Sequence, residues 1–284
     1  ATVSEGGSVP AGGYTWAELP PDGGFLADPF IVPGSEPLTV LAEQLTAHDL
    51  MGRIVRLELS QDGWSSPEPV LPLPAHASYP YLFTAEINGQ TSTFLVPETS
   101  ALRQVRLYVG TADGRSWRLH RVLLDDVALA DPTVFRHDGR WWLLGTDADA
   151  GVNTHLVGFW ADELDGPWRP HAANPLKVDI ASARPAGTPW TDPSGLIRPA
   201  QDSTERYGAQ VVLQRVTCLT ADAFAEVLYG VVAPDPGSAY PDGLHTVCRD
   251  GDRVVIDGCR RAPAFRRVVP AVRRQLSRSP EEVR

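Results

Sequence analysis

The sequence predicts an all-β fold, a five-bladed β-propeller followed by a short basic C-terminal helix or tail. Three observations lead to this prediction. Alternating apolar and polar residues, the pattern of strands with one buried face, dominate the chain. Its 26 prolines and 25 glycines favour frequent turns over long helices. A proline-containing phrase also recurs at roughly 50 residues, about the length of one four-stranded propeller blade.

Strands are predicted where this alternation is sustained and a turn sequence such as HDGR or DGDR follows. The predicted strands are 53–59, 91–96, 104–109, 140–145, 155–161, 208–216 and 252–258. Helical spacing occurs in 220–228 and in the C-terminal tail. We therefore expect a propeller domain over residues 1–262 and an arginine-rich C-terminal tail, either a helix or an irregular segment, over residues 263–284.

The recurring phrase places one special residue before a proline at the start of a strand. That residue is Asp28, Tyr79 or Asp131 in the first three copies, whose prolines are 51 and 52 residues apart. A looser fourth copy has Arg198 before its proline, and a fifth surrounds His245. A proline needs no ladder donor at a strand's first residue, and the innermost strand of a blade lines the central channel. We therefore expect these five side chains to converge on one axial pocket, and an N-terminal strand to complete the last blade.

Charge and hydropathy argue against several classes of function. The net charge of −10 disfavours nucleic acid or an anionic membrane as the main partner. No apolar run reaches the roughly 18 residues of a membrane span. The first residues lack the regions of a signal peptide, which predicts a cytoplasmic protein, although a processed secreted chain would look the same. The ratio of 24 arginines to one lysine is typical of a GC-rich bacterial genome.

The three cysteines, Cys218, Cys248 and Cys259, form an odd number and include no C-x-x-C pair. This pattern argues against a zinc site or a disulfide scaffold and is typical of reduced cysteines in a cytoplasmic protein. The sequence predicts no cofactor and no metal ligand set, while a metal on the propeller axis and the oligomeric state stay open.

The predicted layout resembles the five-bladed glycosidases of glycoside hydrolase families 43 and 32. Asp28, on the first inner strand, and Asp131, before PTVFRHDGRWW, match two catalytic carboxylates of those families. The resemblance implies that Asp28 is a general base or a nucleophile and that Asp131 tunes the pKa of a partner. The families' third catalytic residue is a glutamate on the fourth blade, where this chain offers Arg198, Gln201 and Asp202 instead.

A closer resemblance covers most of the chain. It rests on the segments FLADPF, SYPYLF, VPETS, DPTVFRHDGRWWLL, NPLKVDIASARPAG, LIRPAQDS, YGAQVVL and DGLHTV. Together they resemble the N-terminal propeller domain of plant glucosamine inositolphosphorylceramide transferases. The same domain is similar to domains attached to formyltransferase-like bacterial proteins. This resemblance implies a carbohydrate-related role and no particular reaction.

Cleavage of a glycosidic bond needs two carboxyl groups, one protonated and one that activates water or attacks. Asp28 and Asp131 supply carboxylates from two blades, and Glu98 in LVPETS is the candidate for the missing acid. Glu43 in LAEQLTAHD is a second candidate. Each glutamate could equally be a capping or surface residue. The separation of the carboxylates, which decides retention or inversion, cannot be predicted from the sequence.

Substrate-binding candidates surround the predicted pocket. They are Tyr79, Arg184, Arg198, Gln201 and His245. Arg184 and Arg198 would favour an anionic or phosphorylated sugar, because arginine binds carboxylates and phosphates in a bidentate manner. Either arginine could instead pair with an acid that braces a blade. Trp160 and Trp190 could stack on a sugar, or pack between blades.

Three functions follow from this pattern. The first is a carbohydrate-active enzyme, glycoside hydrolase-like, that cleaves or transfers at a glycosidic bond with Asp28, Asp131 and Glu98 as its carboxylates. The second is a non-catalytic module that binds a glycan or a sugar phosphate. The third is a propeller that acts as a cyclase or lyase on a small metabolite, since axial carboxylates serve any proton transfer.

Overall fold

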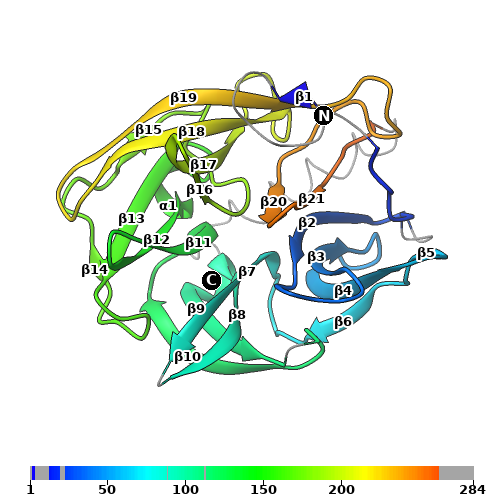
Figure 1. Cartoon of the computed structure of the whole chain (residues 1–284), viewed down its shortest axis with the longest axis horizontal. Coiled ribbons are helices and arrows are strands. Elements are labelled where there is room, and N and C mark those ends of the chain that lie inside the picture. Colours follow the sequence, from blue (N-terminus) through cyan, green and yellow to red (C-terminus); the bar gives the residue numbers. More distant parts are fainter. Residues whose placement is uncertain (1, 4–12, 20–22, 88, 112, 262–284) are drawn as a thin grey trace, which may run out of the picture.

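A computed structural model describes residues 2–3, 13–19, 23–87, 89–111 and 113–261. Its sheets are arranged like blades around a central hub, with the first strand of each blade innermost (Figure 1). The first blade contains β2 (Phe25–Ile31), β3 (Thr39–Leu45), β4 (Gly52–Ser60), β5 (Gly63–Trp64) and β6 (Glu68–Leu71). The second contains β7 (Ser78–Ile87), β8 (Gln90–Glu98), β9 (Gln104–Gly110) and β10 (Trp117–Asp125), with the 3-10 helix η1 (Ser100–Leu102) before β9.

The third and fourth blades complete the ring. The third contains β11 (Leu129–His137), β12 (Arg140–Asp147), β13 (His155–Ala161), β14 (Arg169–Pro170) and β15 (Lys177–Val178), and the short helix α1 (Ala148–Gly151) follows β12. The fourth contains β16 (Trp190–Asp192), β17 (Gly195–Asp202), β18 (Gln210–Leu219), β19 (Phe224–Ala233) and β1 (Thr2–Val3). The N-terminal strand therefore completes the fourth blade, where it pairs antiparallel with β19.

The prediction of five blades is wrong, because the described chain forms four. The segment expected to form the fifth contains only the two-stranded sheet of β20 (Val247–Asp250) and β21 (Arg253–Ile256). This hairpin lies between the first and fourth blades (Figure 1). Two short strands cannot cover the face of the first blade, and an apolar cavity of about 240 Å³ remains there, lined in part by Val40, Leu57 and Val255.

Two predictions concerned helices. Residues 220–228 were expected to be helical, but they contribute to β19, which pairs with β18 along most of its length. Tertiary context overrides propensity here, since Glu226 turns inward to pair with Arg198 at 2.7 Å. The predicted C-terminal tail, 263–284, lies outside the described residues. Within the described part of the chain, no helix has the length and apolar composition needed to span a membrane.

The proline phrase produces the same backbone distortion in three blades. Asp28, Tyr79 and Asp131 have positive φ angles of 51°, 43° and 50°, which residues other than glycine rarely adopt. Each lies at a register shift between the first two strands of its blade. Such a bulge re-aims a side chain and leaves residues unpaired. Three blades therefore carry a strained position at the hub, a cost that usually marks a functional or bracing role.

Candidate functional site

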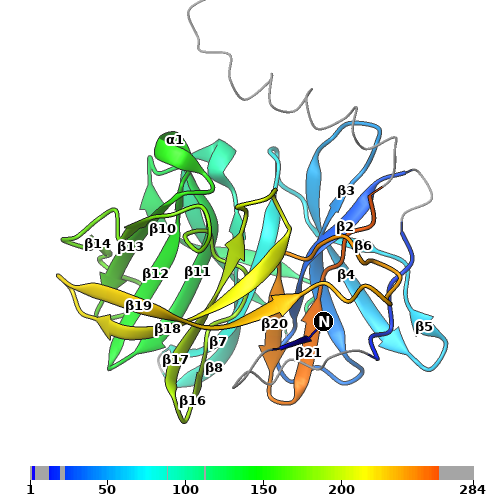
Figure 2. The ribbon, with the colours of Figure 1, turned by 90° about the horizontal axis from the view of Figure 1, so that it is seen from above.

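The structure brings Asp28 and Asp131 together at the hub, as the proline phrase predicted. They are 5% and 2% exposed and interact electrostatically with each other. Asp131 lies near the end of the third blade at which β12 is followed by α1, because Leu129 at the start of β11 pairs with Asp147 at the end of β12. Figure 2 shows α1 at one face of the molecule.

Polar side chains on the neighbouring strands surround the same hub. They are Glu43 on β3, Glu98 at the end of β8, Gln201 on β17 and Asp257 directly after β21. Their exposure lies between 1% and 9%. The hub thus collects five carboxylates, whereas Arg184 and His245 are its main cations. Excess negative charge is its dominant electrostatic feature.

The fourth copy of the proline phrase is Arg184-Pro185, and its assignment to Arg198 was wrong. Pro185 follows the proline of the third copy by 53 residues, which continues the spacing of 51 and 52. Gln201 N donates to Arg184 O, so the segment around residue 184 runs beside β17 on the side that faces the hub. Arg198, on β17, is 2% exposed and donates to Glu226 and to Ser182 O. It braces the fourth blade and does not face the hub.

Arg184 holds Asp131 in place. Its Nε lies 2.6 Å from Asp131 Oδ2 and its Nη2 lies 3.2 Å from Oδ1. Gln201 Nε2 also donates to Asp131 Oδ2 at 3.0 Å. Burial raises the pKa of Asp131 to about 6, although Arg184 opposes the shift. Asp131 is therefore held by three donor contacts and has little freedom to move with a substrate.

Glu98, the predicted acid, has both carboxylate oxygens occupied. Oε1 accepts from Ser100 Oγ at 2.9 Å, and Oε2 accepts from Asp131 N at 3.1 Å. Arg184 Nη2 lies 3.9 Å from Oε2. Glu98 therefore lies at the hub where it was expected, and its contacts are those of a residue that orients Asp131 and Arg184.

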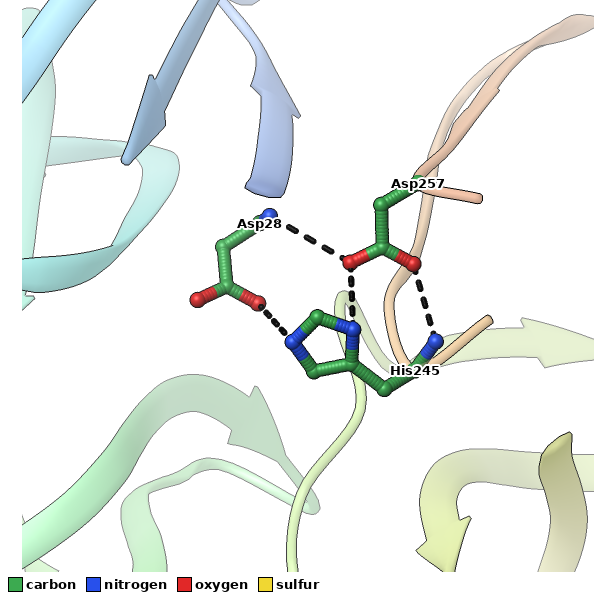
Figure 3. Close-up of side chains that lie close together, drawn as sticks. All are labelled: Asp28, His245 and Asp257. Carbon is green, nitrogen blue, oxygen red and sulfur yellow. Dashed lines mark hydrogen bonds and ion pairs between the residues drawn. The ribbon is translucent and has the colours of Figure 1, made fainter. Parts of the chain in front are cut away.

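His245 lies between two carboxylates (Figure 3). Its Nδ1 is 2.7 Å from Asp257 Oδ2, and its Nε2 is 3.3 Å from Asp28 Oδ1. Burial lowers the pKa of His245, but Asp257 and Asp28 outweigh it and raise the value to about 10. The ring is therefore an imidazolium at neutral pH. These three residues have ligand atoms within 4.8 Å of one another, but a metal ion would have to displace that proton first.

Two hub carboxylates keep one oxygen without a protein partner. Asp28 Oδ1 accepts from Thr246 Oγ1 at 2.6 Å, whereas its Oδ2 accepts no hydrogen bond from any residue that the structure describes. The same holds for Glu43 Oε2 across the described ranges, while Oε1 lies 3.5 Å from His76 Nε2.

Burial raises the pKa of Asp28 to about 6, although His245 opposes the shift. Burial, Asp28 and Glu98 raise the pKa of Glu43 well above its usual value. Because the two groups interact and each has a raised pKa, ionisation of one favours the protonated form of the other. A pair of carboxyl groups that holds one proton in this way offers both a general base and a general acid.

The three aromatic residues that were predicted to contact a ligand all pack against other parts of the protein. Tyr79 is fully buried and accepts from Gly187 N at 2.8 Å, so it braces two blades and offers no surface to a ligand. Trp160 is stacked between Arg140 and Arg169 on the third blade. Trp190 packs against the core of the fourth blade.

Three residues at the hub had not been predicted. Tyr207 is 53% exposed, and its ring lies 5.3 Å from that of His245 and 5.1 Å from Arg184 Cζ. His76 reaches Glu43 from the segment before β7. Asp257 accepts from the backbone N of His245. Only Asp257 had a sequence signal, because the turn RDGDR fixes a hairpin register that places residue 257 beside His245 and Thr246.

The hub groups predict a stability that falls as pH rises. Asp28 and Asp131 have folded pKa values near 6, above the usual 3.8, so the folded state binds their protons more tightly. The free energy of unfolding should therefore fall between pH 4 and 6, by about 3 kcal/mol for each group. The raised pKa of His245, about 10, extends the loss from pH 6.5 to 10. Thermal unfolding across pH 4.5–9.5 measures this, and a Tm that rises from pH 5 to 7 would contradict it.

Residues 15–240 match the protein family described as glucosamine inositolphosphorylceramide transferase 1, N-terminal. The curated protein of that name from Oryza sativa subsp. japonica is 32% identical over 219 residues, and that from Arabidopsis thaliana is 29% identical over 221 residues. These alignments cover 73% and 75% of this chain, but 29% and 28% of the relatives. The chain therefore spans less than a third of the length of those relatives.

Solved structures with a similar fold are glycoside hydrolases. A family 117 glycoside hydrolase from Zobellia galactanivorans gives a TM-score of 0.53 at 16% identity, over 74% of this chain and 70% of that chain. The GH43_1 enzyme from Xanthomonas citri, complexed with xylotriose, gives 0.52 at 13% identity, over 83% and 81%. At these identities the likeness concerns the fold alone, and it confirms a glycosidase-like propeller.

The relatives also correct one expectation. They are proteins of rice and Arabidopsis, so the expectation of a bacterial protein, drawn from the arginine-to-lysine ratio, is wrong. That ratio follows the base composition of a genome, which is not a property of bacteria alone. The resemblance to formyltransferase-associated bacterial domains stays a prediction.

Proposed function

This chain belongs to the family of the N-terminal domain of glucosamine inositolphosphorylceramide transferase 1, and on that premise we propose that its hub binds a carbohydrate and catalyses acid/base cleavage or transfer at a glycosidic bond. One observation carries the proposal. Asp28 and Glu43 are buried carboxyl groups whose charges interact and whose pKa values are both raised, and each has one oxygen that accepts no hydrogen bond from the described residues.

The two carboxyl groups take different roles. Asp28, ionised above pH 6, activates water or attacks the anomeric carbon through Oδ2. Glu43, the protonated member of the pair, donates its proton to the leaving oxygen. Glu98 and Asp131 share Arg184 and keep the surrounding electrostatics fixed, so Glu98 is assigned to positioning rather than to proton donation.

The charge of the hub favours a neutral sugar over a phosphorylated one. Arg184 is bound to Asp131 through both Nε and Nη2, and Arg198 is bound within the fourth blade. Neither guanidinium is free to receive a phosphate. The surrounding carboxylates would repel a dianion. Tyr207 supplies an exposed aromatic face on which a neutral sugar ring can stack.

A second function, a non-catalytic glycan-binding module, is favoured by the low exposure of the hub acids. Asp28, Glu43, Glu98 and Asp131 are 2% to 9% exposed, which leaves little room for a substrate to reach them without movement of the rim. In that case the rim around Tyr207 would bind a sugar, and the carboxylates would only stabilise the contacts between the blades.

A substrate screen separates the two functions. We expect the protein to release 4-nitrophenol from at least one of the α- and β-4-nitrophenyl glycosides of glucose, galactose, xylose, arabinose and N-acetylglucosamine. Replacement of Glu43 by Gln should slow the matching disaccharide more than the nitrophenyl glycoside, because nitrophenol leaves without a proton donor. Binding in calorimetry without turnover would favour the module. Neither binding nor turnover with any of these sugars would contradict both functions.

A further inference from the structure

We propose that His76 is a positioning residue that keeps the proton of Glu43 on Oε2, the oxygen without a hydrogen-bond partner among the described residues. This inference rests on the proposed function, since it specifies how the acid of that reaction is prepared. It assigns a role to a residue outside the predicted site, carried on the segment between β6 and β7.

Hydrogen bonding fixes the tautomer of His76. Gly52 N donates to His76 Nδ1 at 3.0 Å, so Nδ1 must be the unprotonated nitrogen. The ring proton therefore lies on Nε2, which is 3.5 Å from Glu43 Oε1. At this distance a hydrogen on Oε1 would be brought close to the one on Nε2, so Oε1 is favoured as the unprotonated oxygen. The carboxylic proton of Glu43 is then confined to Oε2.

The start of β4 is shaped for this contact. A Cβ atom at Gly52 would lie 2.5 Å from His76 Cε1 and 2.6 Å from Glu43 Oε1, far closer than real contacts allow. Glycine is thus the only residue at position 52 that lets the backbone N–H, the imidazole and the carboxyl group meet.

His76 is neutral in the state in which Glu43 holds its proton. Burial lowers the pKa of His76, and a second proton on Nδ1 would face the N–H of Gly52. Asp28 pulls in the opposite direction but contributes less. The charged groups that act on Glu43 are Asp28, Glu98, Asp131 and His245. Neutral His76 can therefore orient the Glu43 proton without adding a positive charge, which would lower the pKa of Glu43 and favour loss of that proton.

The tautomer can be measured without a substrate. We expect the 15N chemical shifts of His76 in the full chain to show a bare Nδ1 and a protonated Nε2 at pH 7. An Nδ1–H tautomer, or an imidazolium at pH 7, would overturn the proposal even if the protein proved not to be an enzyme. If His76 carries its proton on Nε2 but no glycoside is turned over, the placement of His76 beside Glu43 is supported and only the proposed function is contradicted.

Kinetics then test the consequence with the 4-nitrophenyl glycoside that the protein turns over best among those named above and its matching disaccharide. His76→Leu should lower kcat for the disaccharide roughly tenfold, with little change in KM. It should also move the basic limb of the kcat profile to higher pH, because removing the N–H dipole 3.5 Å from Oε1 disfavours ionised Glu43. His76→Gln, whose amide offers both an acceptor and a donor, should restore most of the rate.

The matched control is His48→Leu, a change at an exposed histidine in the loop between β3 and β4. It should leave kcat and its pH profile unchanged. A wild-type rate in His76→Leu, or equal losses in His76→Leu and His76→Gln with the folded state intact by circular dichroism, would overturn the proposal.

Discussion

Asp28→Asn is expected to remove glycoside turnover by a factor of about 10² to 10⁴ while the protein still folds and binds its sugar. The carboxylate oxygen Oδ2, which accepts no hydrogen bond within the described part of the chain, is assigned to attack or to activate water, and an amide can do neither. The amide keeps an oxygen that can accept from Thr246, so the strained backbone at position 28 retains that support. Turnover of the best nitrophenyl glycoside and calorimetric binding measure the two effects.

Asp192→Asn is the matched control. Asp192 lies on β16, where its carboxylate accepts from Ser194 and Tyr229 and has no contact with the hub. The same chemical change there should leave turnover intact. Equal activity in Asp28→Asn and the wild type would remove the base from the proposed mechanism.

The repeat explains how much of the site could be predicted from the sequence. Asp28 and Asp131 lie about 100 residues apart, yet the phrase that contains them and its regular spacing placed both at one hub. A strand start that recurs at fixed intervals is a physical signal, because equivalent positions of successive blades face the same axis. The all-β propeller class and the position of these two carboxylates at the hub could therefore be predicted from the repeated local sequence.

The errors arose where local pattern and blade position disagree. Two arginine–proline pairs occur in the fourth unit, at Arg184 and Arg198, and only the first continues the spacing of the repeat. Arg198 has the stronger strand sequence around it, which favoured the wrong choice. The predicted number of blades was wrong for a similar reason, because a two-stranded hairpin and a full blade begin with the same strand and turn.

The remaining hub residues depend on tertiary contacts that no spacing encodes. His76 and Tyr207 come from connecting segments, whose course is set by packing rather than by a periodic pattern. Glu43 and Glu98 were both plausible acids in the sequence. They differ in their partners, because Ser100 Oγ and Asp131 N occupy the two oxygens of Glu98, whereas Glu43 Oε2 accepts no hydrogen bond from the described residues.

Arg184→Met is expected to lower the free energy of unfolding by about 3–5 kcal/mol at pH 7, because it leaves Asp131 buried and without its counter-ion. Arg184 is 13% exposed at its side chain and contacts both Asp131 and Glu98, so solvent cannot replace it. Denaturant unfolding followed by circular dichroism measures the loss. The deficit should shrink at pH 5, since Asp131, with a folded pKa already raised to about 6, can then be neutralised by a proton.

A second substitution shows whether the loss comes from the unpaired carboxylate. Arg184→Met combined with Asp131→Asn should recover much of the stability at pH 7, because no uncompensated charge remains in the hub. Arg103→Met is the matched control: Arg103 also contacts two acids, Asp126 and Asp149, but on the surface, and its loss should be smaller. If Arg184→Met proved as mild as Arg103→Met, or lost equal stability at pH 5 and pH 7, the hub acids would not be held by Arg184. The fixed electrostatic setting proposed for Asp28 and Glu43 would then lose its physical basis.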